Sequence, residues 1–158
     1  MGKKTGPNPT DRAKSGTKRS LHTDGAGVPL GVAVDGANRH DCKLLETTLA
    51  SSPIERPEPN DEQTQGMCLD KGYDYDFVRE MLLELGYEPH VRSRGEEKID
   101  LKTIPGYRAR RWVVERTHSW MNRFRRLLIR WEKKARNYLG FLHFVCAIIA
   151  YRVAGLLG

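Results

Sequence analysis

The stretch Val28-Pro-Leu-Gly-Val-Ala-Val34 is nearly all apolar, and the shorter stretch Arg19-Ser-Leu-His-Thr-Asp24 precedes it across Gly25-Ala26-Gly27. Two such arms joined by a glycine-containing turn predict a β-hairpin. An arm with almost no polar residue has no face suited to water, so we expect the second arm to lie centrally in a sheet. The fold is therefore expected to be built around this hairpin.

Apolar periodicity predicts further elements after the hairpin. Asp41 is expected to be the N-cap of a helix whose apolar stripe is Leu44, Leu45 and Leu49. The other expected elements are a strand at 67–69, a helix at 77–85 closed by Gly86, a strand at 88–92 and a helix around Glu115, with polar connections at 51–65 and 93–105. This order predicts an α/β domain with a mixed sheet and flanking helices.

Length and charge narrow the class of protein. The chain has 158 residues, a length that suits one domain. Its formal net charge of +7 indicates a polyanionic partner, for which nucleic acid is favoured over an acidic membrane. We expect residues 1–18, rich in Gly, Pro, Lys and Thr, to form a basic flexible segment, and residues 19–158 to form the domain. Three widely spaced cysteines predict neither a disulfide framework nor a zinc site, so a reducing cytoplasm is expected.

The segment Tyr138–Leu157 is nearly as long and apolar as a membrane span. His143 and Arg152 would both be costly in lipid, and glycines mark its two ends. We therefore interpret the segment as a buried packing helix, and we expect no membrane partner.

A second basic stretch, Arg111-Trp-Val-Val-Glu115-Arg-Thr-His-Ser-Trp-Met-Asn-Arg-Phe-Arg-Arg126, carries one carboxylate. Its apolar residues recur every three or four positions, which predicts one helix stripe: Val113, Thr117, Trp120, Phe124, Leu127 and Trp131. At about 100° per residue, Glu115 lies about 200° from Val113 and so faces away from that stripe. An acid among cations suits a metal ion and a polyanion. The alternative is an Arg111–Glu115 ion pair on a solvated helix face.

Asp70 follows the predicted strand at 67–69 and precedes a glycine turn. Carboxylates at that end of a strand point into the crevice where open α/β sheets bind ligands. The alternative is that Asp70 only accepts hydrogen bonds from turn amides. Together, Asp70 and Glu115 offer the hard oxygen ligands that Mg²⁺ or Mn²⁺ prefers. Such ions assist phosphodiester chemistry, while nearby arginines hold the phosphates.

Several motifs resemble bacterial insertion-sequence transposases of the DDE class, in the right order and over nearly the whole chain. The matching stretches are Gly6-Pro-Asn-Pro-Thr-Asp-Arg12, Lys14-Ser-Gly-Thr-Lys18, Asp24-Gly-Ala-Gly-Val-Pro-Leu30, Ala37-Asn-Arg-His-Asp41, Asp70-Lys-Gly-Tyr-Asp74 and Arg111-Trp-Val-Val-Glu-Arg116. The most similar type is the insertion sequence five family, whose catalytic domain is IS-four-like.

The resemblance implies a ribonuclease-H-like fold and metal-dependent DNA cleavage and strand transfer. It makes Asp70 the second and Glu115 the third catalytic and metal-binding carboxylate, and it matches Arg111 to a motif arginine. Tyr107 and Asn122-Arg123 match the related tyrosine and lysine positions less well. Combining the resemblance with the basic pattern, we expect DNA contacts from Arg108, Arg111, His118, Asn122, Arg123, Arg126, Lys14, Lys18 and Arg19.

The family's first catalytic Asp lies upstream of the Gly6–Arg12 motif, and no aspartate here occupies its place. We therefore expect the C-terminal portion of a transposase, with a sheet that lacks its first strand. This chain alone is expected to be a poor or inactive catalyst. Its expected partners are an upstream transposase half or other transposase subunits, together with transposon-end and target DNA. The expected location is the bacterial cytoplasm, near the nucleoid. The alternatives are a non-catalytic DNA-binding fragment or decayed remnant that acts as a competitor, and a structural nucleic-acid-associated protein.

Overall fold

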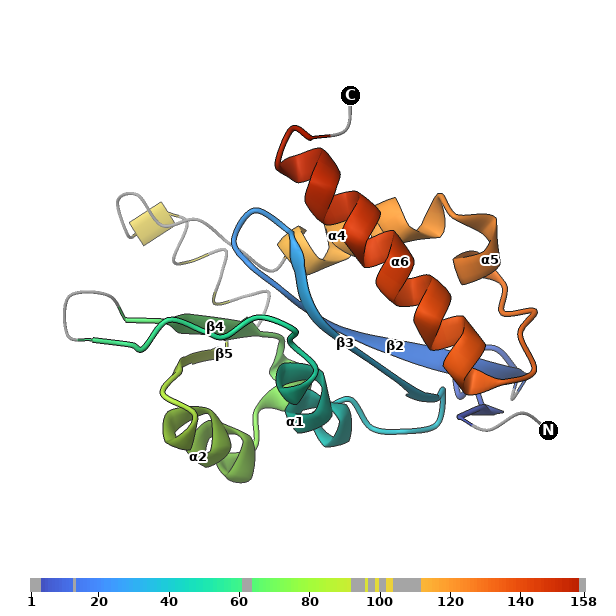
Figure 1. The fold of residues 1–158 in the computed structure, drawn as a ribbon. Coiled ribbons are helices and arrows are strands. Elements are labelled where there is room, and N and C mark those ends of the chain that lie inside the picture. Colours follow the sequence, from blue (N-terminus) through green and yellow to red (C-terminus); the bar gives the residue numbers. More distant parts are fainter. Residues whose placement is uncertain are drawn as a thin grey trace. The chain divides into compact units, whose positions relative to one another are not determined.

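The computed structural model describes residues 4–12, 14–60, 64–91, 96, 99, 102–103 and 112–156. The chain divides into two compact units. Unit 1 comprises Met1–Ile54 and Val113–Gly158, and unit 2 comprises Glu55–Trp112 (Figure 1).

Unit 1 contains a three-stranded antiparallel sheet in the order β1-β2-β3, with helices before and after unit 2 in the sequence. Its elements are β1 (Gly6–Pro7), β2 (Ser15–Thr23), β3 (Pro29–Gly36), α1 (Cys42–Ala50), α4 (Trp112–Asn122), α5 (Arg125–Leu128) and α6 (Ala135–Val153). The expected hairpin is confirmed, because β2 pairs with β3 from Thr17 opposite Gly36 to Thr23 opposite Pro29.

The N-terminal segment enters this sheet instead of staying flexible. β2 begins at Ser15, so the expected boundary between residues 18 and 19 falls inside a strand. β1 pairs with the start of β2, with Gly6 opposite Gly16. Backbone pairing with an existing hairpin satisfies peptide groups even where side chains are small, and composition does not reveal this.

β3 is buried on both of its faces, which explains its apolar sequence. Val32 and Val34 belong to one core cluster with α6, which contributes Tyr138, Leu142, Val145 and Ile149. The other face carries Gly31 and Ala33, because side chains alternate along a strand. A Cβ atom at Gly31 would overlap the backbone carbonyl of Thr48 in α1, so only glycine permits this close approach. The burial expected for this arm is confirmed, but among the described strands β3 lies at an edge of the order β1-β2-β3, so the expected central position is wrong.

The helix after Asp41 is confirmed as α1, but Asp41 does not cap it with its side chain. The Asp41 carboxylate instead accepts a hydrogen bond from Lys18 Nζ at 3.1 Å. The expected stripe is also shifted, since Thr48 is buried and Leu49 is only partly buried. Thr48 Oγ1 donates to Ser20 Oγ at 2.8 Å, which ties α1 to β2.

The stripe expected from Val113 to Trp131 is interrupted. α4 ends at Asn122, and Phe124 has an extended backbone with φ −87° and ψ 100°, so α5 starts as a separate helix. Met121, fully buried, joins the core, whereas Trp131 lies beyond α5 and is 74% exposed. The prediction that Trp131 belongs to the buried stripe is therefore wrong, because the helical spacing does not continue past the end of α4.

Unit 2 contains a parallel pair of strands connected through a helix. Its elements are β4 (Gly66–Leu69), the 3₁₀ helix η1 (Lys71–Tyr73), α2 (Asp76–Glu84) and β5 (Glu88–Val91). Met67, Val78 and Leu82 form its buried apolar residues. Gly86 closes α2 with a φ of +72°, a conformation that favours glycine.

Among the described residues the strands pair as two sheets, one antiparallel in unit 1 and one parallel in unit 2, and the expected mixed sheet stays a prediction. The α/β class is confirmed. The segment Tyr138–Leu157 is largely α6, and one stripe of it packs against β3, so the expected packing helix is found, but its other side is exposed rather than buried. Among the helices of the described residues, none is long and apolar enough to span a membrane.

Candidate functional site

Asp70 stands at the end of β4, where it begins η1. Its backbone is extended, and its Oδ1 accepts a hydrogen bond from the Gly72 amide at 2.8 Å. The turn-capping interpretation of Asp70 is therefore realised in the structure. The side chain nevertheless stays exposed, and the cap engages only Oδ1. Capping is thus compatible with Oδ2 binding a second group.

Glu115 lies in the first turn of α4 and is exposed. It forms no hydrogen bond or ion pair with any residue that the structure describes. A carboxylate near a helix N-terminus is stabilised by the helix dipole, typically by about 0.3–1 kcal/mol. Arg111, the partner in the ion-pair alternative, lies outside the described residues.

The orientation of Glu115 is set by its neighbours in α4. Thr117 is fully buried, and its Oγ1 donates to the Gly27 carbonyl oxygen at 2.8 Å. Arg116 Nη2 donates to the Ala26 carbonyl oxygen at 2.6 Å, and the guanidinium lies 4.9 Å from the centre of the Trp120 ring. These contacts attach α4 to the turn of the β2–β3 hairpin, and Glu115 lies on the side of the helix that they leave open.

Asp70 belongs to unit 2 and Glu115 to unit 1. Within the described part of the chain, no three His, Cys, Asp or Glu side chains form a cluster suited to a metal ion. The shared-ion site therefore stays a prediction. Each carboxylate separately has the exposed hard oxygen that Mg²⁺ or Mn²⁺ requires.

His118 and Asn122 connect α4 to β2 rather than projecting freely. Arg19 Nη2 donates to Asn122 Oδ1 at 2.7 Å. Burial of His118, together with the charge of Arg19, lowers the His118 pKa from 6.5 to about 4. His118 is consequently uncharged at neutral pH, and it adds no positive charge to the surface there.

Other basic side chains of this region support the fold. Arg126 Nη2 lies 2.6 Å from Glu132 Oε1, and the Glu132 side chain is only 7% exposed. Arg130 Nη1 donates to Thr17 Oγ1 at 2.8 Å and its guanidinium lies 5.4 Å from the Tyr138 ring centre. Lys18 pairs with Asp41 at 3.1 Å. Of these three pairs, Arg130–Thr17 joins β2 to the α4–α6 region, Lys18–Asp41 joins β2 to the start of α1, and Arg126–Glu132 lies within the α5–α6 region.

In a separate set of exposed cations, the side chains form no hydrogen bond, ion pair or ring contact with a residue that the structure describes. The set lies around α5 and the start of α6 and consists of Arg123, Arg125, Lys133, Lys134 and Arg136. We call this set the basic strip. Of the DNA contacts expected from the sequence, Arg123 belongs to it, whereas Lys14 lies near Asp11 at 3.8 Å and Arg108 and Arg111 fall outside the described residues. Lys133, Lys134 and Arg136 were missed, although the local run of basic residues was visible.

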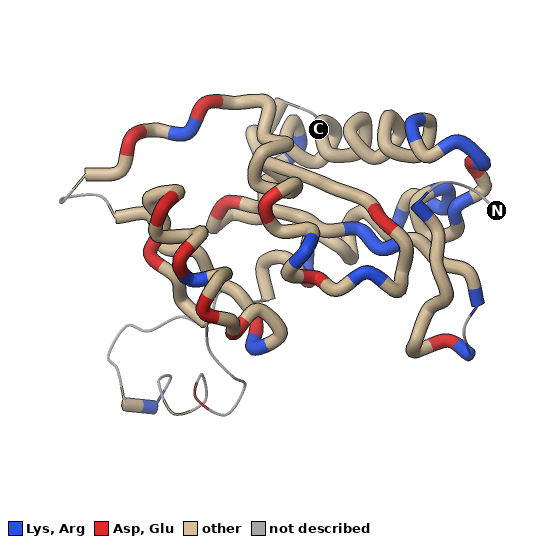
Figure 2. The backbone as a smooth tube through the Cα atoms, turned by 90° about the horizontal axis from the view of Figure 1, so that it is seen from below, with Lys and Arg blue, Asp and Glu red and all other residues tan. Residues whose placement is uncertain are grey.

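Charge is divided unevenly between the units. Unit 1 has 17 Lys or Arg and 7 Asp or Glu, a formal charge of +10, whereas unit 2 has 10 and 13, a formal charge of −3. Figure 2 shows these charged positions along the backbone. The positive net charge of the chain therefore comes from unit 1 alone, where a polyanion would be attracted.

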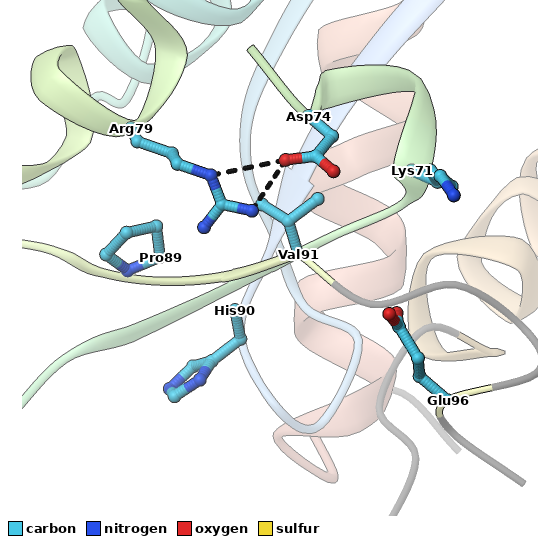
Figure 3. A pocket seen from close by; sticks show the side chains of 7 residues that line it. All are labelled: Lys71, Asp74, Arg79, Pro89, His90, Val91 and Glu96. Carbon is cyan, nitrogen blue, oxygen red and sulfur yellow. Dashed lines mark hydrogen bonds and ion pairs between the residues drawn. The ribbon is translucent and has the colours of Figure 1, made fainter. Parts of the chain in front are cut away.

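Unit 2 has a polar pocket of about 360 Å³ next to the ends of its parallel strands (Figure 3). It is lined by Lys71, Asp74, Arg79, Pro89, His90, Val91 and Glu96. Asp74 Oδ1 accepts hydrogen bonds from Arg79 Nε and Nη2 at 3.2 and 2.6 Å, so the charge of Arg79 is balanced inside the pocket. No sequence pattern indicates this pocket, because its lining residues come from η1 and the residue after it, from α2, from β5 and from Glu96 beyond β5.

Comparison with known proteins places these features in a family. The "Transposase DDE domain" family matches residues 2–150, so the chain belongs to the DDE transposases and its role lies in DNA transposition. It is 40% identical over 151 residues to a Burkholderia cepacia protein named "Putative transposase for insertion sequence element IS402", covering 94% of this chain and 69% of that protein. No solved structure shows a significant match. The family assignment made from the motifs is confirmed.

The buried His118 makes folding stability depend on pH. Because its folded-state pKa of about 4 lies below the ordinary 6.5, the unfolded chain binds the proton more tightly. The free energy of unfolding should then fall by about 2–3 kcal/mol as pH decreases from 6.5 to 4. Urea unfolding at several pH values measures this. His118→Gln should flatten the curve between these limits, and an unchanged pH dependence in that variant would contradict the assignment.

Proposed function

We propose that the chain forms part of a DNA transposase that catalyses metal-dependent DNA cleavage and strand transfer with a catalytic domain of ribonuclease-H-like fold. Asp70 and Glu115 are the two catalytic carboxylates that this chain supplies. The observation that carries the proposal is that the family match covers both residues and each side chain is exposed.

The donor set fits Mg²⁺ or Mn²⁺, which bind carboxylate oxygens together with phosphate oxygens. Such ions, when bound, favour formation of the attacking oxygen nucleophile and stabilise the departing oxygen. The chain's own contribution is orientation. Gly72 holds one oxygen of Asp70, and the contacts of Arg116 and Thr117 with the hairpin turn fix the helix that carries Glu115.

We do not assign the third carboxylate to the aspartates of the β1–α1 region, because none of them lies upstream of the Gly6–Arg12 motif, where the resemblance places the family's first catalytic Asp. Asp24 accepts hydrogen bonds from the Ala26 and Val28 amides in the hairpin turn. Asp35 accepts from the Gly36 amide, Asp41 binds Lys18, and Asp11 lies near Lys14. We therefore propose that an upstream segment, encoded in an adjoining frame or carried by another subunit, completes the site.

DNA phosphates would be held by the basic strip, with Lys14, Arg19 and the predicted Arg108 and Arg111 as further contacts. Exposed cations whose side chains have no partner among the described residues lose little when they bind phosphate, and they release counterions from DNA. Such a protein would act in the bacterial cytoplasm, at the nucleoid. The +10 charge of unit 1 also favours a second candidate function, in which the chain binds DNA without cleaving it and competes with an intact transposase.

Removing either carboxylate should abolish transposition. Asp70→Asn and Glu115→Gln each remove the charge that holds a divalent ion, so we expect at least a roughly 100-fold loss of transposon-end cleavage in cells carrying the complete element. Asp76→Asn and Glu46→Gln are matched controls, since both are exposed helix carboxylates. Undiminished cleavage by either site variant would remove that residue from the mechanism, and equal loss in the controls would point to general destabilisation.

The salt dependence of DNA binding should reflect the phosphate contacts that the basic strip makes. Arg125→Ala and Lys134→Ala should each lower the slope of log affinity against log salt by about one, because each removes one phosphate contact. Lys43→Ala, an exposed cation on α1, is the matched control. Fluorescence anisotropy with duplex DNA measures the slopes. If Lys43→Ala changes the slope as much as the strip variants do, binding is spread over the whole basic unit instead.

A further inference from the structure

The side of α6 that faces away from β3 carries an unusual pattern of exposed residues. They recur with alternating spacings of three and four along the helix: Asn137, Gly140, Phe144, Ala147, Tyr151 and Ala154, the last at the C-cap. This is the spacing of a coiled-coil seam, in which such positions contact a partner helix. We call these six residues the α6 seam.

The seam lies opposite the packed face of the helix. At about 100° per residue, its mean direction is about 160° from that of Tyr138, Leu142, Val145 and Ile149, which form the buried stripe. α6 therefore has two stripes at helical spacing, of which the fold of unit 1 uses one. Phe144 and Tyr151 are 60% and 53% exposed on the unused one. Apolar rings repeated at seam spacing are typical of a contact surface.

Size alternates strictly along the seam. Asn137, Phe144 and Tyr151 are the larger residues, and Gly140, Ala147 and Ala154 separate them. If two such helices run antiparallel, every large residue lies opposite a small one. Asn137 then meets Ala154, Gly140 meets Tyr151, and Phe144 meets Ala147. A parallel arrangement would instead place rings against rings and leave the small residues facing each other.

Open space at Gly140 and support for Phe144 agree with this pairing. A Cβ atom added at Gly140 would have no atom of the described residues within 4 Å, so there is room for a ring from outside. Phe144 packs against Phe141, with ring centres 6.4 Å apart, and the Arg126 guanidinium lies 5.3 Å from the Phe141 ring. The exposed ring is thus held by neighbours in its own unit.

Charge favours the antiparallel direction as well. Of the four cations on α6 and the residues just before it, Lys133, Lys134 and Arg136 lie at the N-terminal end and only Arg152 lies in the last turn. An antiparallel partner brings its negative helix C-terminus, with unpaired carbonyl groups, beside these cations. A parallel partner would bring its own Lys133, Lys134 and Arg136 to the same place, which repulsion disfavours.

We propose that α6 pairs with α6 of a second copy of this chain, antiparallel and about a two-fold axis between Phe144 and Ala147. The contact is self-complementary, as a two-fold interface requires, because each pair of opposing residues occurs twice. The seam spans about 26 Å of helix, which places the interface near the small end of specific interfaces. The dimer is therefore weak and depends on protein concentration. The proposal does not rest on the chemistry of Asp70 or Glu115.

Sedimentation equilibrium of the full chain between about 1 and 100 μM tests this interface, and self-association is expected in that range. Gly140→Leu should weaken it at least roughly tenfold, since the new side chain occupies the space required by Tyr151 of the partner subunit. The same change replaces glycine inside a helix and should raise the melting temperature, so loss of the dimer cannot be attributed to unfolding. Phe144→Ser should weaken association similarly.

The matched control is Val153→Ser, an apolar-to-serine change at an exposed position on another side of α6, and it should leave association unchanged. A chain that stays monomeric at about 100 μM overturns the proposal. Equal effects of Val153→Ser and Phe144→Ser overturn it too, since the contact would then lie elsewhere. Acidic vesicles provide a further test. If they abolish self-association and bind the chain through Phe144, the partner of the seam is a lipid surface, and the proposal is overturned.

Disulfide cross-linking tests the direction of pairing. Cys42 and Cys68 are replaced by Ser, whereas Cys146 can stay because burial raises its pKa to about 11 and suppresses the thiolate. A mixture of Phe144→Cys and Ala147→Cys chains should form mixed dimers faster than either chain forms its own. Faster self-linking of Ala147→Cys would show a parallel pair and contradict the proposed geometry.

Discussion

The structure around Glu115 depends on two hydrogen bonds between α4 and the β2–β3 turn. Arg116 and Thr117 donate to the carbonyl oxygens of Ala26 and Gly27, residues about 90 positions earlier in the chain. Gly27 permits this contact, since its φ is +85° and an added Cβ would lie 2.9 Å from both donor atoms. A buried Thr117 fixes the rotation of α4, and Glu115 is left facing out because the inward positions are already occupied.

The same hairpin organises the rest of unit 1. β3 is covered by α6 through Val32 and Val34 and by α1 at Gly31, so the strand has no solvent-facing side. Cations then act in two distinct roles. Arg116, Arg126 and Arg130 bind groups of the fold, whereas the basic strip remains exposed and available to a polyanion. The basic residues of unit 1 thus both attach its helices to the rest of the fold and provide its positive surface charge.

Local patterns predicted the elements better than their roles. The hairpin, the strand before Asp70, the helix ending at Gly86 and the packing stripe of α6 follow from apolar spacing and turn residues, which act within a few positions. The burial of His118, the pairing of Arg126 with Glu132 and the exposure of Trp131 depend on tertiary contacts or a helix end. The division into two sheets depends on which strands meet, and no periodicity encodes that. Asp70 and Glu115 were proposed as site residues from family motifs and from the position of Asp70 at a strand end. The basic strip could be defined only from the structure, which distinguishes cations that contact other residues of the fold from cations that are exposed.

The central claim is that Asp70 and Glu115 bind the same divalent ion, and Mn²⁺ titration followed by nuclear magnetic resonance tests it most directly. A paramagnetic ion broadens amide signals only in its close vicinity. The account predicts that the amides of Gly72 and Glu115 broaden together over one range of Mn²⁺ concentration, and that Asp70→Asn abolishes the broadening at both. Broadening at only one of them, or broadening near Glu115 that survives Asp70→Asn, would contradict a shared ion.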